Sequence, residues 1–356
     1  MIHSNFQLFL SLLTLRTLRE NKTKISKSYV ILYQTAETRK EPTLKRRLKI
    51  FAGQSNPGLA QEICDSLSIN PGQMTANKFS NCNIKVRIEE SVREDDVFVI
   101  QTGYPDTNEA LMELLIIIDA LKYASASRIT AVMPYYPYVR SDKKDEPRIS
   151  ITARLVADLL ETAGADRILT MDLHAPQIVG FSRIPVDQLQ IQHTMSNYIE
   201  EKHLENFVIA APDVGSAKRA EAFARRLDVP MVILDKRRYS DNEKATILRI
   251  IGDVKGRDCV IIDDEVSTGG SMVEACRALQ EHGALNLIAG CTHGVLTGNA
   301  CDRIQESPIS EFVTTNTINQ TRNNCHPKIT VLSVGRLFSE AIAAIHMGTS
   351  VSKLFM

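Results

Sequence analysis

The stretch Cys259–Ser271, CVIIDDEVSTGGS, decides the fold of this 356-residue chain. A short run of apolar residues leads into the adjacent carboxylates Asp263 and Asp264, and a loop with two glycines follows them. The helical pattern over 272–282 comes next and ends at Gly283. A buried strand, a tight loop and a helix in this order are the unit from which parallel sheets covered by helices are built.

The loop within this stretch has the features of a phosphate site. Backbone N–H groups of residues 268–271 would point at a phosphate at the start of the helix, and the two carboxylates could accept hydrogen bonds from ribose hydroxyls. It is not a Walker A loop, since no GKS or GKT follows. An ordinary strand-to-helix turn is the alternative, but adjacent buried carboxylates are costly without a ligand or a metal. We therefore expect a sugar-phosphate site here.

The same alternation of short apolar runs and helical patterns continues from Leu48 onward and forms two blocks. The expected strands are 49–51, 97–101, 129–133 and 168–171 in the first block, and 208–211, 231–234, 259–262, 287–291 and 311–315 in the second. The sequence thus predicts an α/β fold with two tandem, doubly wound parallel-sheet domains, over 48–190 and 191–356, and a boundary near 185–200.

Composition excludes several classes of protein. Forty-two basic and 42 acidic residues give a net charge of zero, so no global positive field exists to hold nucleic acid or an anionic membrane. The seven cysteines are scattered and contain no CxxC pair, which favours a reduced compartment and predicts a cytoplasmic protein. The apolar run over 6–15 is too short to span a bilayer.

The segment 1–47 differs from the rest of the chain, because it holds ten Lys or Arg and only three acids. Three interpretations remain open for this extension: an organellar targeting peptide, a surface helix, or an over-long gene start. In each of them the segment is dispensable for the chemistry.

Two more expected strands end in carboxylates. Asp213 follows the strand 208–211 and precedes a small-residue loop with Lys218 and Arg219, a pattern that suits Mg²⁺ and a diphosphate. The alternative there is a surface turn with two solvated bases. Asp172 and His174 follow the strand 168–171 and should lie on the same side, because side chains alternate along a strand. A lone histidine is usually structural, but this pair predicts a metal or phosphate contact.

Two basic segments complete the candidate site. Residues 235–242, DKRRYSDN, could fold as a flap over a reacting phosphoryl group, although most runs of this kind are solvated loops. Residues 134–144, PYYPYVRSDKK, combine three tyrosines with Arg140 and two lysines. That mixture suits a nucleotide, or else a rigid proline-containing loop that packs its tyrosines.

With these residues in hand, the chain from about Leu48 to Phe355 resembles the ribose-phosphate diphosphokinases, also called phosphoribosyl pyrophosphate synthetases. The resemblance rests on nine blocks in one order: KFSN (78–81), ESVREDDVFVIQTG (90–103), NEALMELLIIIDA (108–120), SDKKDEPR (141–148), TMDLHAPQIVGF (170–181), PDVGSAKR (212–219), VIIDDEVSTGGS (260–271), THG (292–294) and TNTI (315–318). So many ordered blocks are far more specific than any single loop.

The resemblance implies an activity, a fold and an assembly. Enzymes of this family transfer the β,γ-diphosphoryl group of ATP, with Mg²⁺, to the C1 hydroxyl of ribose 5-phosphate, giving 5-phosphoribosyl 1-diphosphate and AMP. The product supplies purine, pyrimidine, NAD, His and Trp biosynthesis. The implied fold is that of the type I phosphoribosyltransferases, with the nucleotide side in 48–190 and the ribose 5-phosphate side in 191–356. The implied assembly is a dimer-based homohexamer regulated by ADP and phosphate.

The resemblance also implies roles for individual residues. The catalytic flap residues are Lys236 and Arg238. The ATP-binding residues are Phe79, Asn81, Cys82, Asn83, Arg140, Ser141, Asp145 and His174, of which the first four would reach a neighbouring subunit. The ribose 5-phosphate ligands are Arg238, Asp263, Asp264, Ser267, Thr268, Gly269, Gly270 and Ser271. The metal-binding residues are His174 and Asp213, with Asp172 in support.

Four positions depart from the family pattern. Asn83 replaces a glutamate in the ATP hairpin, which removes a carboxylate contact to ribose but leaves an amide that can hydrogen-bond. Ser141 replaces a glutamine, and Ser267 replaces an aspartate beside the phosphate, where less negative charge need not harm binding. Arg183 replaces an aspartate and puts one metal contact in doubt.

These departures motivate an alternative, in which the chain is a non-catalytic subunit that joins a ring and regulates active subunits. The charges retained at the strand ends favour the enzyme, since a purely structural subunit has no physical need for them. A phosphoribosyltransferase that consumes the diphosphate would use the same sugar-phosphate loop, but it does not explain the blocks around Phe79 and over 140–145.

Overall fold

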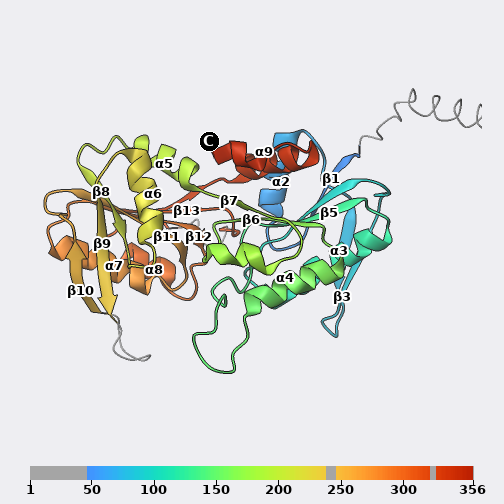
Figure 1. Ribbon diagram of the computed structural model, residues 1–356, viewed down its shortest axis with the longest axis horizontal. Coiled ribbons are helices and arrows are strands. Elements are labelled where there is room, and N and C mark those ends of the chain that lie inside the picture. The colour runs from blue at the N-terminus through green and yellow to red at the C-terminus, as the bar shows by residue number, and fades with distance from the viewer. Residues whose placement is uncertain (1–45, 238–245, 321–325, 356) are drawn as a thin grey trace, which may run out of the picture. The chain divides into compact units, whose positions relative to one another are not determined.

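Two large sheets run through the residues that the structure describes, which are 46–237, 246–320 and 326–355 of the computed structural model (Figure 1). Their neighbouring strands are parallel with one exception, an antiparallel pair at the edge of the second sheet. The predicted α/β fold with two parallel sheets is confirmed. The predicted extension falls, up to residue 45, outside the described residues.

The first sheet has the strand order β1-β4-β5-β6-β7. Its strands are β1 (Leu48–Ala52), β4 (Asp96–Ile100), β5 (Arg128–Met133), β6 (Arg167–Met171) and β7 (Val186–Leu189). Its helices are α2 (Pro57–Leu67), α3 (Thr107–Tyr123) and α4 (Thr152–Ala163), and the hairpin of β2 (Met74–Lys78) and β3 (Ile84–Ile88) precedes β4. Alternate strand residues pack on α3 and α4 on one face and on α2 on the other, so the apolar runs are nearly continuous.

The second sheet has the order β10-β9-β8-β11-β12-β13-β14. Its strands are β8 (Phe207–Ala211), β9 (Met231–Arg237), β10 (Thr246–Ile251), β11 (Asp258–Val266), β12 (Leu287–Gly294), β13 (Glu311–Thr315) and β14 (Ile329–Leu332). The helices are α5 (Gln192–Glu200), α6 (Ala217–Leu227), α7 (Gly270–Glu281), α8 (Ala300–Gln305) and α9 (Gly335–His346), with short 3-10 turns at Pro176–Phe181 and Val351–Phe355. β11 lies at the centre of this sheet, with its residues almost entirely buried.

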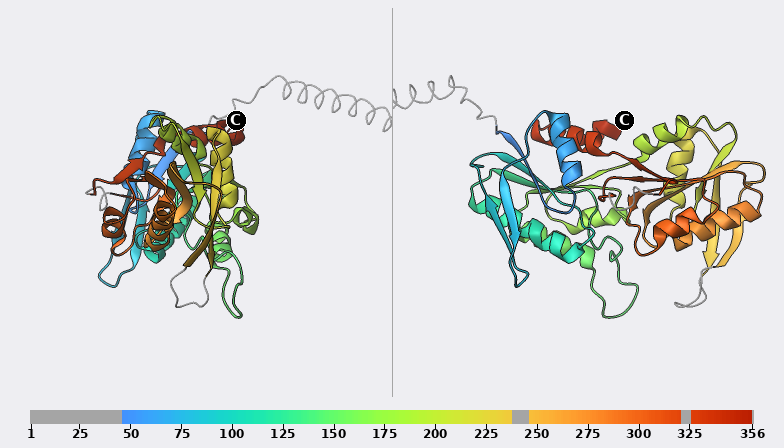
Figure 2. Two further views of the ribbon diagram at one scale, coloured as in Figure 1. Left: turned by 90° about the vertical axis from the view of Figure 1, so that its left-hand side faces the viewer. Right: turned by 180° about the vertical axis from the view of Figure 1, so that it is seen from behind.

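One hydrophobic core joins the two sheets. It contains apolar residues of α2 and β4 from the first half of the chain together with residues of α6, β11 and α9 from the second. α9 follows the last strand of the second sheet and packs against α2, as Figure 2 shows from two sides. The predicted domain boundary near 190 stays a prediction, and the two halves share side-chain packing across it.

Each of the nine expected strands overlaps an observed strand, with ends that differ by a few residues. β7, β10 and β14 were not predicted. Two of them form the edges of the second sheet, and β7 forms an edge of the first. Edge strands need less continuous apolar sequence than central ones, and β7 reads VDQL, so the apolar pattern gives little sign of it.

Candidate functional site

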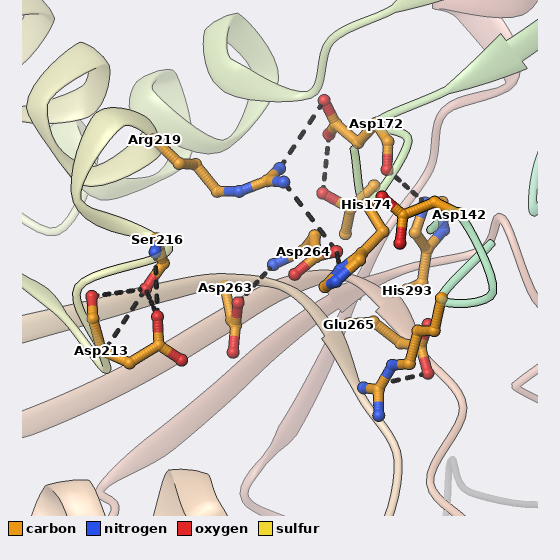
Figure 3. Close-up of polar contacts among 12 residues, drawn as sticks. Asp142, Asp172, His174, Asp213, Ser216, Arg219, Asp263, Asp264, Glu265 and His293 are labelled. Atoms are coloured by element: carbon orange, nitrogen blue, oxygen red, sulfur yellow. Dashed lines mark hydrogen bonds and ion pairs between the residues drawn. The ribbon is translucent and has the colours of Figure 1, made fainter. Parts of the chain in front are cut away.

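The carboxyl end of β11 carries the most strongly connected acid of the site, Asp264. One of its carboxylate oxygens lies 2.7 Å from Nδ1 of His174, which follows β6. Arg219 of α6 approaches both Asp264 and Asp172, at 4.0 Å from an oxygen of each (Figure 3). Burial alone would raise the pKa of Asp264, but His174 and Arg219 hold it well below its usual range. The same contact raises the pKa of His174.

Asp263 is adjacent to Asp264, but its pKa shifts in the opposite direction. Its Oδ1 accepts a hydrogen bond of 2.9 Å from the backbone N–H of Asp264. Burial and the neighbouring negative charge of Asp264 raise the pKa of Asp263 well above its usual value. The two carboxylates of the pair thus differ, because the pKa of Asp264 is lowered and that of Asp263 is raised. Two such groups at one strand end can both accept from and donate to sugar hydroxyls.

Asp172 and His174 lie at the same strand end, but they have different environments. Asp172 is buried, has a left-handed backbone with φ of 34°, and accepts hydrogen bonds from Ile191 N–H and Thr292 Oγ. His174 keeps 43% of its side chain exposed. His174 is therefore the residue of this pair that faces solvent. Asp172 is buried and contributes through its ion pair with Arg219.

Asp213 lies in the loop that follows β8, and this loop holds its side chain. Its Oδ1 accepts hydrogen bonds of 2.9 Å from both the N–H and the hydroxyl of Ser216, which fixes the turn into α6 (Figure 3). The residue is exposed. Within the described ranges, no three His, Cys, Asp or Glu side chains are arranged to hold a metal ion. Mg²⁺ usually takes only one or two carboxylates and completes its shell with water and substrate phosphates, so the exposed carboxylate of Asp213 fits that ion. The role of His174 as a metal ligand stays a prediction.

The predicted phosphate loop forms the turn from β11 into α7. Gly269 caps the helix with φ of 72°, a left-handed conformation that favours glycine. Thr297 N–H donates to Ser267 O over 2.9 Å, and Arg303 donates to Thr268 O, so the neighbouring segment holds the loop in place. The N–H groups at the start of a 12-residue helix, together with its dipole, favour an anion at this position.

The nucleotide-side residues of the prediction divide into two groups. Arg140 lies in the loop after β5 and forms an ion pair with Glu265, with 3.2 Å between Nη2 and Oε1. Ser141 bonds to the backbone of Ser150, which braces that loop, and Asp145 lies on its exposed part. Arg140 and His174 thus reach the end of β11, whereas Asp145 does not contact it.

The second group is the tip of the β2–β3 hairpin, which lies apart from these residues. Phe79 is 53% exposed, and Asn81, Cys82 and Asn83 are exposed as well. The tip is closed by its own backbone: Phe79 N–H donates to Asn83 O, and Cys82 adopts a left-handed φ of 66°. An exposed aromatic residue on a self-supported hairpin is what contact with a neighbouring subunit would require, and that role stays a prediction.

The flap residues are placed only in part. The backbone of Lys236 belongs to β9 and pairs with Ile247 of β10, but its side chain and the whole of Arg238 lie outside the described residues.

Sequence reasoning missed three residues of this site. Glu265 was not singled out within its block, Arg219 was treated only as one of two loop cations, and His293 was not assigned a role. His293 is buried, and its Nε2 lies 3.2 Å from Met171 O. Burial lowers the pKa of His293. Only the tertiary contacts reveal these three roles.

Comparison with known proteins agrees with this arrangement. Residues 48–164 match the N-terminal domain of ribose phosphate pyrophosphokinase, and residues 238–356 match the phosphoribosyl synthetase-associated domain. The ribose-phosphate pyrophosphokinase of Caldanaerobacter subterraneus subsp. tengcongensis is 50% identical over 309 residues, which are 86% of this chain and 98% of that protein. The enzyme of the same name from Deinococcus radiodurans is 48% identical over 313 residues, with the same coverage of 86% and 98%.

A solved structure gives the same result for the fold. The crystal structure of phosphoribosylpyrophosphate synthetase from Mycobacterium smegmatis superposes with a TM-score of 0.81 at 43% identity, covering 85% of this chain and all of that one.

Proposed function

The chain belongs to the ribose-phosphate pyrophosphokinase family, and we propose how its residues carry out the reaction of that family. The C1 hydroxyl oxygen of ribose 5-phosphate attacks the β-phosphorus of ATP. The bond between that phosphorus and the α,β-bridging oxygen breaks, AMP leaves, and the hydroxyl proton is released to solvent. The retained acids at the strand ends and the close relatives together favour the enzyme over a non-catalytic subunit.

The end of β11 and the start of α7 receive ribose 5-phosphate. Ser267–Ser271 surrounds the 5-phosphate with N–H groups, and Asp263 and Asp264 hold the ribose hydroxyls. The observation that carries this proposal is the continuity of the two sites: the same nine-residue strand that delivers the carboxylates turns directly into the helix that would bind the phosphate.

The transferring diphosphoryl group lies between His174 and Asp213. These two residues would hold Mg²⁺, which neutralises charge on the phosphate oxygens when it is bound. Lys236 and Arg238 close over the same group and stabilise the charge that builds up in the transition state. Arg219, already between Asp172 and Asp264, adds a fixed positive charge on the ribose side.

The nucleotide is held by Arg140, Ser141 and Asp145 from one subunit and by the hairpin tip of a neighbour. The family resemblance implies a dimer-based homohexamer, in which the exposed hairpin tip of one subunit would reach the nucleotide of a neighbour. ADP and phosphate are proposed regulators. No helix among the described residues is long and apolar enough to cross a membrane. None of the six cysteines that the structure describes forms a disulfide bond, which supports our proposed assignment to the cytoplasm.

Product analysis tests the proposal. Purified full-length protein, and a form that lacks residues 1–47, are incubated with ATP, Mg²⁺ and ribose 5-phosphate, and the nucleotides are separated. We expect AMP and 5-phosphoribosyl 1-diphosphate in equal amounts from both forms. ADP as the product would exclude diphosphoryl transfer. A folded, assembled protein that forms no AMP would instead support the regulatory subunit.

A further inference from the structure

Glu265 is a buried acid that the reaction as described does not use. It follows Asp264 on β11 (Figure 3). Only 5% of its side chain is exposed. Its two oxygens have different partners: Oε1 pairs with Arg140 over 3.2 Å, and Oε2 accepts a hydrogen bond of 3.2 Å from the Tyr135 hydroxyl. Both partners come from the loop after β5, so the contacts join the second sheet to a loop of the first.

The two sides of the ion pair differ in rigidity. Glu265 belongs to the central strand of its sheet, in register with His293 of β12. The ring of Tyr135 packs on the buried ring of His293 with 5.0 Å between centroids, which fixes the second partner of the acid. Arg140, in contrast, has 56% of its side chain exposed. The exposed side chain of Arg140 is therefore held by the buried carboxylate of Glu265, whose position the central strand fixes.

We propose that Glu265 is a positioning residue that orients Arg140 for the phosphates of the nucleotide. The inference rests on the proposed role of Arg140 in binding ATP. The guanidinium group has five N–H donors, so one pairing with Glu265 leaves others for a phosphate. Because Asp264 holds His174 in the same way, consecutive residues of β11 set the positions of two nucleotide-side residues from the other sheet.

The contact with Glu265 should strengthen ATP binding by reducing the conformational entropy that Arg140 loses when it binds a phosphate. A free arginine side chain loses much of its conformational freedom when it captures a phosphate, and this loss weakens affinity by about 2- to 10-fold. An arginine that is already oriented avoids most of it. The effect should therefore appear in the KM for ATP and leave both kcat and the KM for ribose 5-phosphate nearly unchanged, since neither Glu265 nor Arg140 contacts the phosphate loop of α7.

Steady-state kinetics of two Glu265 variants of the full-length enzyme, of Arg140→Ala and of the two double variants tests this inference. Glu265→Gln keeps the shape and a hydrogen-bond acceptor but loses the charge, and Glu265→Met keeps the volume and loses both. We expect the KM for ATP to rise about 3-fold in the first and about 10-fold in the second. Adding either Glu265 change to Arg140→Ala should raise it no further, because the two residues act as one unit.

A matched control separates positioning from folding. Glu311 is another largely buried glutamate of the same sheet, and it lies away from the site. Its Oε2 pairs with Nζ of Lys202 at a distance of 2.8 Å. Glu311→Gln removes this charge and should leave the KM for ATP unchanged. An unchanged or lowered KM in both Glu265 variants, with a raised one in Arg140→Ala, would overturn the inference alone. An unchanged KM in Arg140→Ala would overturn the proposed role of Arg140 and the inference with it.

Discussion

The ends of β11 and β5 contribute to the same site but are built differently. β11 stays in register with β12 through Asp263 and Glu265, and then turns at once into α7. β5 ends at Met133, and 18 residues pass before α4 begins at Thr152, with Arg140 half-exposed among them. The residues on the sugar-phosphate side are thus held in place by the backbone of a central strand and a helix. The residues on the nucleotide side are held by individual side-chain contacts, such as that between Glu265 and Arg140. Damage to the first should affect stability and catalysis together, and damage to the second should affect nucleotide affinity alone.

The largest effect should come from Lys236→Ala, which tests whether the second sheet carries the chemistry. We expect kcat to fall about 10²- to 10³-fold, because one charge that stabilises the transition state is lost. Assembly and thermal stability should be unchanged, which size-exclusion chromatography and thermal unfolding would measure. Activity at the level of the unmodified enzyme would exclude Lys236 as a catalytic residue.

A second comparison lies within β11 itself, between its two adjacent aspartates. Asp264→Asn removes an ionised group that His174 and Arg219 stabilise, and it should lower the free energy of unfolding by about 2 kcal/mol at pH 7. Asp263→Asn resembles the protonated form that burial already favours, so stability should stay the same or rise. Thermal unfolding of the metal-free protein measures both, and equal losses would contradict the assigned charge states.

Gly269→Ala should have a smaller effect on the phosphate loop. The added Cβ would meet no atom closer than 3.7 Å, so the cost is the left-handed φ of 72°, about 1 kcal/mol. The KM for ribose 5-phosphate should rise severalfold while the KM for ATP stays constant. The control is Gly283→Ala at the other end of α7, where φ is 90°. It should cost similar stability without changing either KM.

The smallest effect concerns Glu311, far from both strand ends. Burial would raise its pKa, but hydrogen bonds from Lys202, Tyr198 and Thr330 lower it below the usual value of 4.5. A lowered folded-state pKa contributes stability above the unfolded pKa, and this contribution disappears as the pH falls through the folded value. Glu311→Gln should therefore cost about 0.5 to 1 kcal/mol at pH 7, and less as the pH falls below about 4.5. A difference that does not depend on pH would show that packing, rather than charge, holds this contact.

Local sequence was enough to find the central strands and the acids that end them. Apolar runs such as 259–262 are buried wherever they lie in a sheet, so their order along the chain indicated both sheets. Glu265 was not singled out from the sequence, although it contacts Arg140 in the same half of the molecule in which Asp264 contacts His174. Two adjacent residues can reach two loops of one neighbouring sheet, and strand periodicity does not describe that arrangement.

By itself, the sequence determined the fold class, the sugar-phosphate loop and the family, because these depend on short segments whose patterns are read locally. Only the tertiary structure decided that Glu265 pairs with Arg140, that Arg219 lies between Asp172 and Asp264, and that α9 returns to pack against α2. The physical reason is that each of these contacts joins residues distant in sequence. These contacts depend on how the two sheets pack on their shared core, which cannot be predicted from any short segment of the sequence.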